Sequence, residues 1–369
     1  MPRTSRFPLR RSAGFGLVEI MVSVVIGMLA ILVMMQQLSI FEHSKRTTTG
    51  GADAQNNGAI ALYGLQRDIR QSGYGITGYT NTKQYLFTCS AGLSSGGTVP
   101  VVPVIINPAT SVIPAGDANT DTLLVFYGNS NGEPHGNPIY SQTGTVSTVQ
   151  SPGSFTVGDV VMAAPDSCAA NLLPRPVTVV AATTITAATG TVGTGTMYNL
   201  GQSPSVLAYA IRDGNLTMCD YMATNCGVAK ASVTAAVWAA TWVPIANNVI
   251  SMRAQYGVDT TTTMDAVVDT YNQTTPTTMC GWARVSAFRL ALVARNSEYN
   301  KTNPDGTDVT SAAPTWDGSS GAAIDLSKKP DGTANPDWNH YRYKVFQTVV
   351  PMRNMVLLAD APSICTNTP

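Results

Sequence analysis

The chain has 369 residues, which is enough for one large β-rich domain or two average domains with a buried core. Its 22 basic and 22 acidic side chains cancel, and only 12% of residues are charged. This balance gives no indication of a basic face for nucleic acid, and it excludes disorder driven by net charge. The composition also excludes collagen-like, coiled-coil and multi-span membrane proteins.

The acidic residues predict mostly β structure. Eighteen are Asp, and the four Glu are Glu19, Glu42, Glu133 and Glu298. Asp favours turns and caps, whereas Glu favours helix interiors. With many Thr, Val, Gly and Pro residues, this usage predicts strands joined by many turns.

The first forty residues depart from that pattern. Residues 1–14 contain four arginines and no acid, and residues 20–35 contain no charge. As a helix, residues 15–35 would span roughly 30 Å, about one bilayer core. Basic residues before the span keep the short N-terminus in the cytoplasm. Everything beyond about residue 42 is therefore expected outside the inner membrane.

Three interpretations of this segment compete. A signal peptide has a shorter apolar region and a small-residue cleavage site, but Gln36-Gln37-Leu38 follows here. A plain anchor does not explain Glu19, because an ionised carboxylate inside a bilayer costs about 2.5–3.5 kcal/mol or more. In the third interpretation the chain is cut after Gly14. The new amine of Phe15 and the Glu19 carboxylate then pair between neighbouring subunits in an apolar filament core.

The third interpretation coincides with a family resemblance. Gly14-Phe15-Gly16-Leu17-Val18-Glu19, preceded by the basic leader, resembles the cleavage region of type IV prepilins. The signature is specific because leader, cut site, acid and apolar run occur together in order. The resemblance implies cleavage between Gly14 and Phe15 by a membrane aspartic peptidase, N-methylation of Phe15 by the same enzyme, and a role for Glu19 in filament assembly.

Later segments narrow the resemblance to PilW-like minor pilins. They are residues 55–75, 249–259, 282–293 and 343–354, and with the N-terminus they cover about a quarter of the chain. Much of 80–245 resembles no family that we recognise. The implied fold class is α+β: a long N-terminal spine helix packs on a β-rich head of antiparallel sheets with long loops.

The resemblance implies a division of the chain into four parts. These are a cleaved leader (1–14), a hydrophobic transmembrane or filament-core half of the spine (15–41), an amphipathic half (42–73) and an extracytoplasmic head (74–369). An insertion or subdomain is expected within the head at about 80–245.

The amphipathic half also follows from the residues themselves. Its apolar stripe is Ala59, Leu62, Leu65 or Gln66, and Ile69, with Arg67, Asp68 and Arg70 on other faces. Gly73 is placed where a helix stop is expected. The stretch 47–51 (Thr-Thr-Thr-Gly-Gly) disfavours helix and predicts a loosened connection between the two halves.

Strand and turn signals follow residue 85. Strands are predicted at 99–106, 122–127, 157–162, 177–185, 206–211, 249–256, 285–293 and 343–349. A hairpin turn is predicted at Arg212-Asp213-Gly214-Asn215. Residues 296–339, rich in Asn, Asp, Pro, Gly and Ser, are predicted to form a long surface loop.

The six cysteines fit an oxidising compartment. An even count in an extracytoplasmic chain predicts disulfides, with fifteen complete pairings open. Cys219 and Cys226 flank a turn and are the preferred pair. Cys89 with Cys168, and Cys280 with Cys365, follow only by nearest-neighbour elimination. The alternative is that some of the six are buried free thiols.

The search for catalytic and metal sites gives only weak signals. The pattern Gly92-Leu93-Ser94-Ser95-Gly96 fits a nucleophile elbow, but the prolines and β-branched residues after it disfavour the required helix. His43, His135 and His340 are scattered. Asp305, Asp308, Asp317 and Asp331 lack the spacing of a calcium loop, so turn formation is the preferred role. No catalytic residue, cofactor or metal site is expected.

Five tryptophans are candidates for a ligand groove or for core packing. Trp238, Trp242 and Trp282 are expected in the core, whereas Trp316 and Trp338 are expected to make surface contacts.

The expected function is that of a minor pilin that helps initiate or cap a type IV pilus at its tip. Expected partners are other minor pilins, the major pilin, the prepilin peptidase, the inner-membrane assembly platform and, before assembly, membrane lipid. Without its leader the chain has a side-chain charge of −4 (18 basic, 22 acidic), which does not suit a broad nucleic-acid surface. Alternatives are a type II secretion pseudopilin, or a tip adhesin that uses residues 80–245.

Overall fold

The computed structural model describes residues 14, 16–78, 86–165, 168, 170–300, 306–355 and 365. The chain forms two compact units, residues 1–50 and 51–369. The boundary falls within the long helix α1 (Leu17–Gln71), so each unit contains part of this helix. Phe15 and the leader before Gly14 lie outside the described residues.

The first unit contains the apolar part of α1. By length and composition, the segment Leu17–Glu42 is able to cross a membrane. Residues 47–51, expected to disfavour helix, are helical within α1. Two glycines cost roughly 1 kcal/mol each in a helix interior, and the long helical segments on both sides outweigh this penalty.

In the second unit, α1 buries one stripe against the head. Ala54, Ala61, Leu65 and Ile69 are buried, with Leu62 partly so. Two details differ from the sequence prediction. Ala59 is exposed, and Asp68, expected on another face, is 3% exposed. Buried hydroxyl groups opposite Asp68 explain why a carboxylate is tolerated there.

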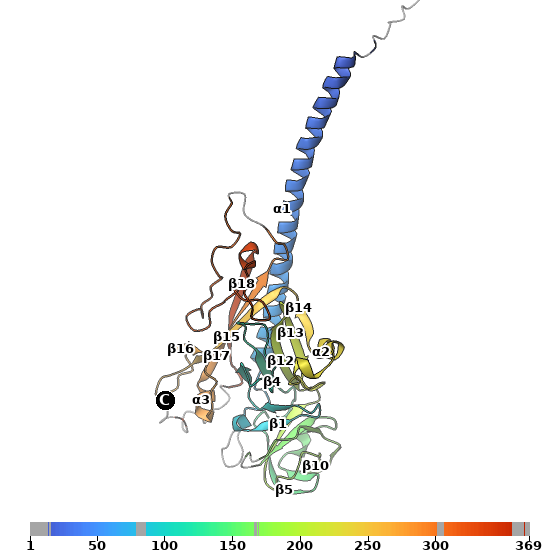
Figure 1. Cartoon of the computed structure of the whole chain (residues 1–369). Helices are drawn as coiled ribbons and strands as arrows, with labels where there is room; N and C mark the ends of the chain where they lie inside the picture. Colours follow the sequence, from blue (N-terminus) through green and yellow to red (C-terminus); the bar gives the residue numbers. More distant parts are fainter. Residues whose placement is uncertain are drawn as a thin grey trace, which may run out of the picture. The chain divides into compact units, whose positions relative to one another are not determined.

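The head is built from antiparallel sheets, as expected (Figure 1). A five-stranded sheet has the order β14 (Val243–Ala246), β13 (Asn215–Asp220), β12 (Ser205–Arg212), β4 (Leu123–Tyr127) and β3 (Val104–Ile106). A four-stranded sheet has the order β16 (Thr270–Asn272), β15 (Val249–Val258), β17 (Val285–Arg295) and β18 (Tyr343–Pro351).

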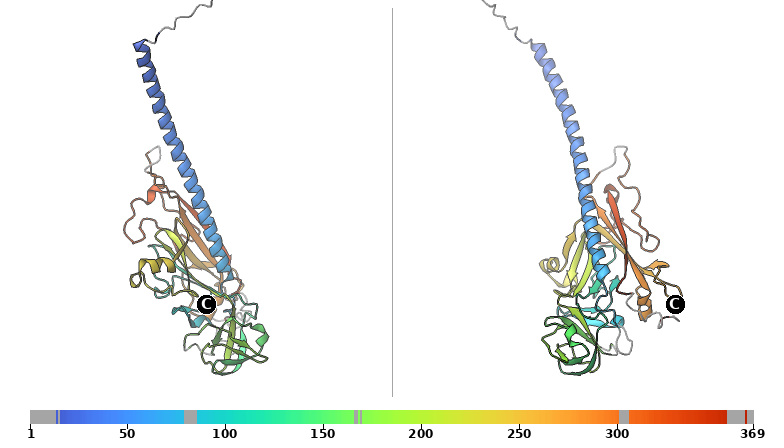
Figure 2. Two further views of the ribbon diagram at one scale, coloured as in Figure 1. Left: turned by 90° about the vertical axis from the view of Figure 1, so that its right-hand side faces the viewer. Right: turned by 180° about the vertical axis from the view of Figure 1, so that it is seen from behind.

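Two further sheets lie in the part of the head without a sequence resemblance. The seven-stranded sheet has the order β8 (Arg175–Pro176), β7 (Val160–Ala164), β11 (Gly195–Gly201), β5 (Asn137–Thr143), β6 (Val146–Val149), β10 (Thr184–Thr186) and β9 (Val179–Val180). The other sheet pairs β1 (Ser90–Gly92) with β2 (Thr98–Pro100). Within the second unit, Figure 2 shows the green seven-stranded sheet at one end and the orange and red strands towards the other.

Short helices connect the strands. They are α2 (Ala235–Thr241), α3 (Met279–Ala283) and the 3-10 turns η1 (Leu86–Thr88), η2 (Pro152–Ser154), η3 (Lys230–Ser232) and η4 (Trp338–His340).

The main core lies between α1 and two of the sheets. It joins the α1 stripe to inward residues of β4, β12, β15 and β17, including Val125, Tyr209, Met252 and Phe288. Alternate β4 residues, such as Leu124 and Phe126, point into a second core that also contains Trp238 and Trp242. The five-stranded sheet is therefore buried on both faces. The seven-stranded sheet has a core of its own.

Most predicted strands are present, and the differences have local causes. The hairpin at 212–215 joins β12 to β13, with Asp213 at φ 51° and Gly214 at φ 72°, as its Asp-Gly pair requires. The predicted strand 99–106 is broken into β2 and β3 around Pro100 and Pro103, which lack the ladder N–H. The predicted strand 177–185 is broken into β9 and β10.

Three disulfides join Cys89 to Cys168, Cys219 to Cys226, and Cys280 to Cys365. These are the pairs named from the sequence. The Cys219–Cys226 bridge follows the end of β13, whereas the other two close loops of 79 and 85 residues.

Candidate functional site

The beginning of α1 presents a long exposed apolar surface. Its large apolar side chains from Leu17 to Phe41 are each more than half exposed. Glu19 lies in the first turn of the helix, and its backbone carbonyl accepts a hydrogen bond from Ser23 Oγ (2.6 Å). So long an apolar surface requires lipid or other helices around it. Gly14 is described, but the expected cut site and N-methylation site at Phe15 lie outside the described residues.

The second part of α1 carries a further exposed apolar face. Ile60 and Tyr63 are 70% and 71% exposed, and their i, i+3 spacing places them side by side. The buried stripe, which includes Ala61 and Leu65, lies on a different side of the helix. The helix therefore presents apolar residues both to its own head and outwards.

A buried carboxylate fixes this helix to the five-stranded sheet. The hydroxyl of Tyr209 donates to Asp68 Oδ2 (2.6 Å), and that of Tyr127 donates to Asp68 Oδ1 (3.1 Å). Arg67 adds an ion pair at 3.1 Å from the solvent side. Burial, followed by the negative charge of Asp68, raises the pKa of Tyr209. Tyr209 is therefore a permanent donor at neutral pH, and it links the spine to β12.

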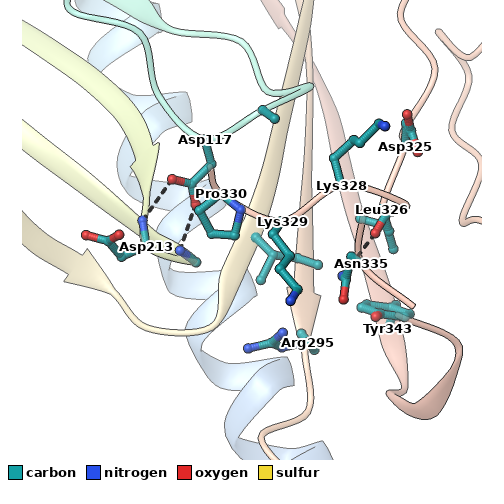
Figure 3. Close-up of a pocket in the computed structure, with 13 residues that line it drawn as sticks. Asp117, Asp213, Arg295, Asp325, Leu326, Lys328, Lys329, Pro330, Asn335 and Tyr343 are labelled. Atoms are coloured by element: carbon teal, nitrogen blue, oxygen red, sulfur yellow. Dashed lines mark hydrogen bonds between the residues drawn. The ribbon is translucent and has the colours of Figure 1, made fainter. Parts of the chain in front are cut away.

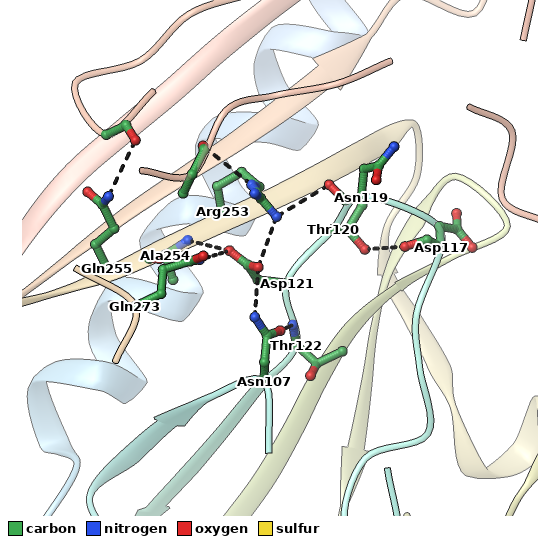
Figure 4. Close-up of polar contacts among 12 residues, drawn as sticks. Asn107, Asp117, Asn119, Thr120, Asp121, Thr122, Arg253, Ala254, Gln255 and Gln273 are labelled. Carbon is green, nitrogen blue, oxygen red and sulfur yellow. Dashed lines mark hydrogen bonds and ion pairs between the residues drawn. The ribbon is translucent and has the colours of Figure 1, made fainter. Parts of the chain in front are cut away.

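A second buried carboxylate, Asp121, links the five-stranded sheet to the four-stranded sheet (Figure 4). Its Oδ1 accepts from Arg253 Nη1 (2.9 Å) and Asn107 Nδ2 (2.9 Å). Its Oδ2 accepts from Gln273 Nε2 (2.7 Å) and the Ala254 N–H (3.0 Å). Four donors satisfy this charge, so its role is to fix β15 against the loop before β4.

A pocket of about 210 Å³ lies on the head beside the β12–β13 turn (Figure 3). Its walls come from this turn, from the end of β17, from β18 and from the loop 325–335. The charged residues that line it are Asp117, Asp213, Arg295, Asp325, Lys328 and Lys329. An adjoining depression of about 400 Å³ shares Asp117, Asp213, Lys329 and Pro330 with the pocket.

One wall of the adjoining depression holds a buried cation. The Arg212 guanidinium lies 4.1 Å from the ring centre of Trp242 and 4.8 Å from that of Trp238. It donates to the carbonyls of Ala115 (2.8 Å) and Pro114 (2.6 Å). Burial lowers the pKa of Arg212 to about 10, which still leaves it charged at neutral pH. These contacts support a structural role.

Within the described residues, the nucleophile-elbow pattern at 92–96 lacks the helix that it requires. A strand, β2, rather than a helix follows residues 92–96, and Ser95 Oγ donates to the carbonyl of Tyr221 (2.7 Å). Among the described residues no group of three or more His, Cys, Asp or Glu side chains is placed to hold a metal ion. Asp305 lies outside the described residues, and Asp331 accepts from the N–H and hydroxyl of Thr333.

The tryptophan prediction is confirmed for three positions and wrong for one. Trp238, Trp242 and Trp282 are buried. Trp316, predicted at the surface, is 6% exposed because loop residues 316–326 pack on the outer face of β17. Its Nε1 donates to the Ala322 carbonyl (2.7 Å). Trp338 is partly buried against the same cluster.

A known protein family matches part of the head. Residues 209–354 match the PilW family, described as type IV pilus-assembly protein W, which confirms the PilW resemblance of the head. No curated protein sequence matches the chain. A type IV-like pilin from Thermus thermophilus is similar to the chain at 11% identity and a TM-score of 0.34, covering 82% of this chain and 97% of that one.

Proposed function

We propose that this chain is a PilW-like minor pilin of a type IV pilus, which helps initiate or cap assembly at the tip. One observation carries the proposal. A single helix, α1, has an uncovered apolar part suited to a membrane or a filament core, and its other part is built into a head whose residues 209–354 match PilW. The role is mechanical rather than catalytic.

The proposed mechanism starts with removal of the leader. A prepilin peptidase cuts between Gly14 and Phe15 and methylates the new amine. The helix then leaves lipid and exchanges its lipid contacts for contacts with other pilin helices. Glu19 pairs with the amine of a neighbouring Phe15, because in an apolar surrounding two opposite charges are far more stable together than apart. This pairing sets the axial register of the subunit.

Before assembly the protein is held in the inner membrane by α1, with its head in the periplasm. The partners at this stage are lipid, the prepilin peptidase and the assembly platform. After extraction the partners are other minor pilins and the major pilin. The exposed Ile60 and Tyr63 extend the apolar contact surface beyond the membrane-length segment. The bulk of the head, which adds a seven-stranded sheet, suits a tip better than a repeating shaft.

The test compares Glu19→Gln with Glu42→Gln, which removes the same charge farther along the same helix. Mass spectrometry should find a mature methylated Phe15 terminus in both variants. Sheared filaments should contain Glu42→Gln at the normal level and little Glu19→Gln, since only Glu19 neutralises the neighbouring amine. Normal recovery of Glu19→Gln would refute its role. Immunogold labelling along whole shafts would refute the tip position.

A second candidate, a ligand-binding head, is favoured by one observation. The seven-stranded sheet has its own core and lies outside the PilW match. Beside it a depression of about 420 Å³ is lined by polar residues from three loops. Deletion of residues 137–201 that leaves piliation intact but abolishes surface attachment would support this candidate. If a strain without this protein instead loses protein secretion and keeps its pili, the protein is a type II secretion pseudopilin.

A further inference from the structure

The pocket beside the β12–β13 turn is lined by both signs of charge, but its acids and its cations differ in how they are bonded. Asp117 accepts from the backbone N–H groups of Asp213 (2.9 Å) and Gly214 (2.8 Å). Asp325 accepts from the Asn119 amide and from the Ser327 N–H, both at 2.9 Å. These two carboxylates are therefore occupied in holding the loops that build the pocket.

The third acid and one cation are also directed elsewhere. In Figure 3 the carboxylate of Asp213 points away from Lys329 and Arg295. Lys328 lies near Asp325, and its charge contributes to lowering the pKa of that carboxyl, after the hydrogen bonds from Ser327. The side chains of Asp213 and Lys328 are therefore not directed at Lys329 and Arg295.

Lys329 and Arg295 also line the pocket, and Figure 3 shows the side chain of Lys329 directed towards Arg295. The charge of Lys329 also contributes, after the hydrogen bonds from Thr333, to lowering the pKa of Asp331, an exposed residue of the adjoining depression. The Arg295 guanidinium lies 4.5 Å from the ring centre of Tyr341, and its Nε is buried without a hydrogen-bond partner. Within the part of the chain that the structure describes, neither side chain forms an ion pair. Two cations that face one pocket repel each other unless an anion lies between them.

We propose that this pocket binds the carboxylate of an acidic side chain from another pilus subunit, held between Arg295 and Lys329. The inference rests on the proposed function for its partner. All lining residues except Asp117 and Ala118 fall within residues 209–354, the part that matches the pilus-assembly family. This location favours contact with another subunit, because the ligand-binding alternative uses the seven-stranded sheet, which lies outside residues 209–354.

The chemistry of the pocket selects a carboxylate. A planar guanidinium presents two parallel donors that match the two oxygens of a carboxylate. A volume of about 210 Å³ accommodates an acidic side chain. The nearby Asp117, Asp213 and Asp325 disfavour a dianion such as phosphate more than a carboxylate, because their repulsion grows with the charge of the bound group.

The experiment uses the full chain in detergent micelles and the peptide acetyl-Gly-Asp-Gly-amide as the probe, with acetyl-Gly-Asn-Gly-amide as the uncharged match. We expect saturable binding of the Asp peptide only, with a Kd on the order of 1 mM, and weakening as salt rises. Lys329→Gln should weaken binding at least fivefold. Arg353→Gln, which removes an exposed charge outside the pocket, should leave it unchanged.

Three outcomes would overturn the proposal. They are no binding of the Asp peptide, equal binding by Lys329→Gln, and tighter binding of glucuronate than of the peptide, which would assign the pocket to acidic sugars. Arg295→Lys preserves the charge but removes the two parallel donors of the guanidinium, and it should weaken binding of the Asp peptide.

A parallel pull-down of the full chain with the other minor pilins separates this inference from the proposed function. The unmodified chain should retain these pilins, and Lys329→Gln should retain fewer. If the peptide binds but the unmodified chain retains no pilin, the proposed function fails and the anion pocket stands. If pilins are retained equally by both chains, the assignment of the pocket to a subunit contact is wrong.

Discussion

Gly58 of α1 lies directly against the ring of Phe346 in β18, 288 residues later in the chain. A Cβ at position 58 would overlap ring atoms Cε2 and Cδ2. Only a glycine lets the helix backbone approach β18 this closely without displacing the ring. Close packing of α1 against β18 at this point therefore depends on the absence of a side chain at position 58.

Replacing Gly58 by alanine should therefore destabilise the head. The ring must move, and overpacking costs about 1–3 kcal/mol, which exceeds the gain in helix propensity of roughly 1 kcal/mol. The matched control is Gly64→Ala in the same helix, where a Cβ meets nothing within 4 Å. Chemical denaturation of the full chain in detergent should rank Gly64→Ala above the unmodified protein and Gly58→Ala below it. The reverse order would contradict the close packing.

Asp68→Asn should loosen the spine from the five-stranded sheet. The amide loses the charge that accepts from Tyr127 and Tyr209, at a cost of about 2–3 kcal/mol in the free energy of unfolding. Arg67→Gln removes the other partner of the same carboxylate, but the Arg67 side chain is 62% exposed, so this loss should stay below about 1 kcal/mol. Equal losses in the two variants would show that the tyrosine contacts contribute nothing.

Stability should fall in alkaline solution because of buried tyrosines. Burial raises the pKa of Tyr256 from 10.0 to about 12, so between these values the unfolded chain releases the proton and the folded chain keeps it. Deprotonation then favours unfolding, by about 1.4 kcal/mol per pH unit for each such tyrosine. Burial also raises the pKa of Tyr127, Tyr209, Tyr221 and Tyr343, which adds to the slope.

The measurement is urea unfolding between pH 9 and pH 12 for the unmodified chain and Tyr256→Phe. At pH 9 the free energy of unfolding of Tyr256→Phe should be lower than that of the unmodified chain, because the Ile106 N–H loses its acceptor. Above pH 10 the stability of the variant should fall less steeply. Parallel curves for the two proteins would show that Tyr256 ionises normally.

The three disulfides should differ in their contribution. In the chain-entropy account, a bridge stabilises more when it closes a longer loop. Cys280–Cys365 has a sequence separation of 85 and Cys219–Cys226 one of 7, which predicts a difference of about 2 kcal/mol. Paired Cys→Ser variants, compared by thermal unfolding, should place Cys219–Cys226 as the less costly bridge to lose. Equal costs would indicate that loop length does not govern these bonds.

Features governed by neighbouring residues were predictable from the sequence. The apolar span of α1 is visible because membrane and filament helices need an unbroken apolar run. The hairpin at Asp213-Gly214 was predicted because the φ > 0 conformation is a local property of these residues. Runs of apolar and β-branched residues are also a local property, and they predicted five strands: 122–127, 206–211, 249–256, 285–293 and 343–349.

Features that depend on a distant partner were not predictable. The helical spacing places Asp68 on a face other than the apolar stripe, and its burial depends on Tyr127 and Tyr209, which lie 59 and 141 residues away. Trp316 was assigned to the surface because its own segment is polar, yet β17 supplies the apolar face that covers it. Strands β5, β6 and β11 were not predicted, because Asn, Gly, Ser, Thr and Gln interrupt their apolar residues and their pairing partners lie elsewhere in the seven-stranded sheet.

The sequence by itself determined the membrane-length helix, the β-rich class of the head and the PilW resemblance, because each depends on residues that are close together in the sequence. Only the tertiary structure decided that Asp68 joins the buried stripe of α1, how Asp68 and Asp121 are satisfied, and that Arg295 and Lys329 face one pocket. The reason is physical: burial and charge pairing depend on distances in space, which the fold sets between residues far apart in the chain.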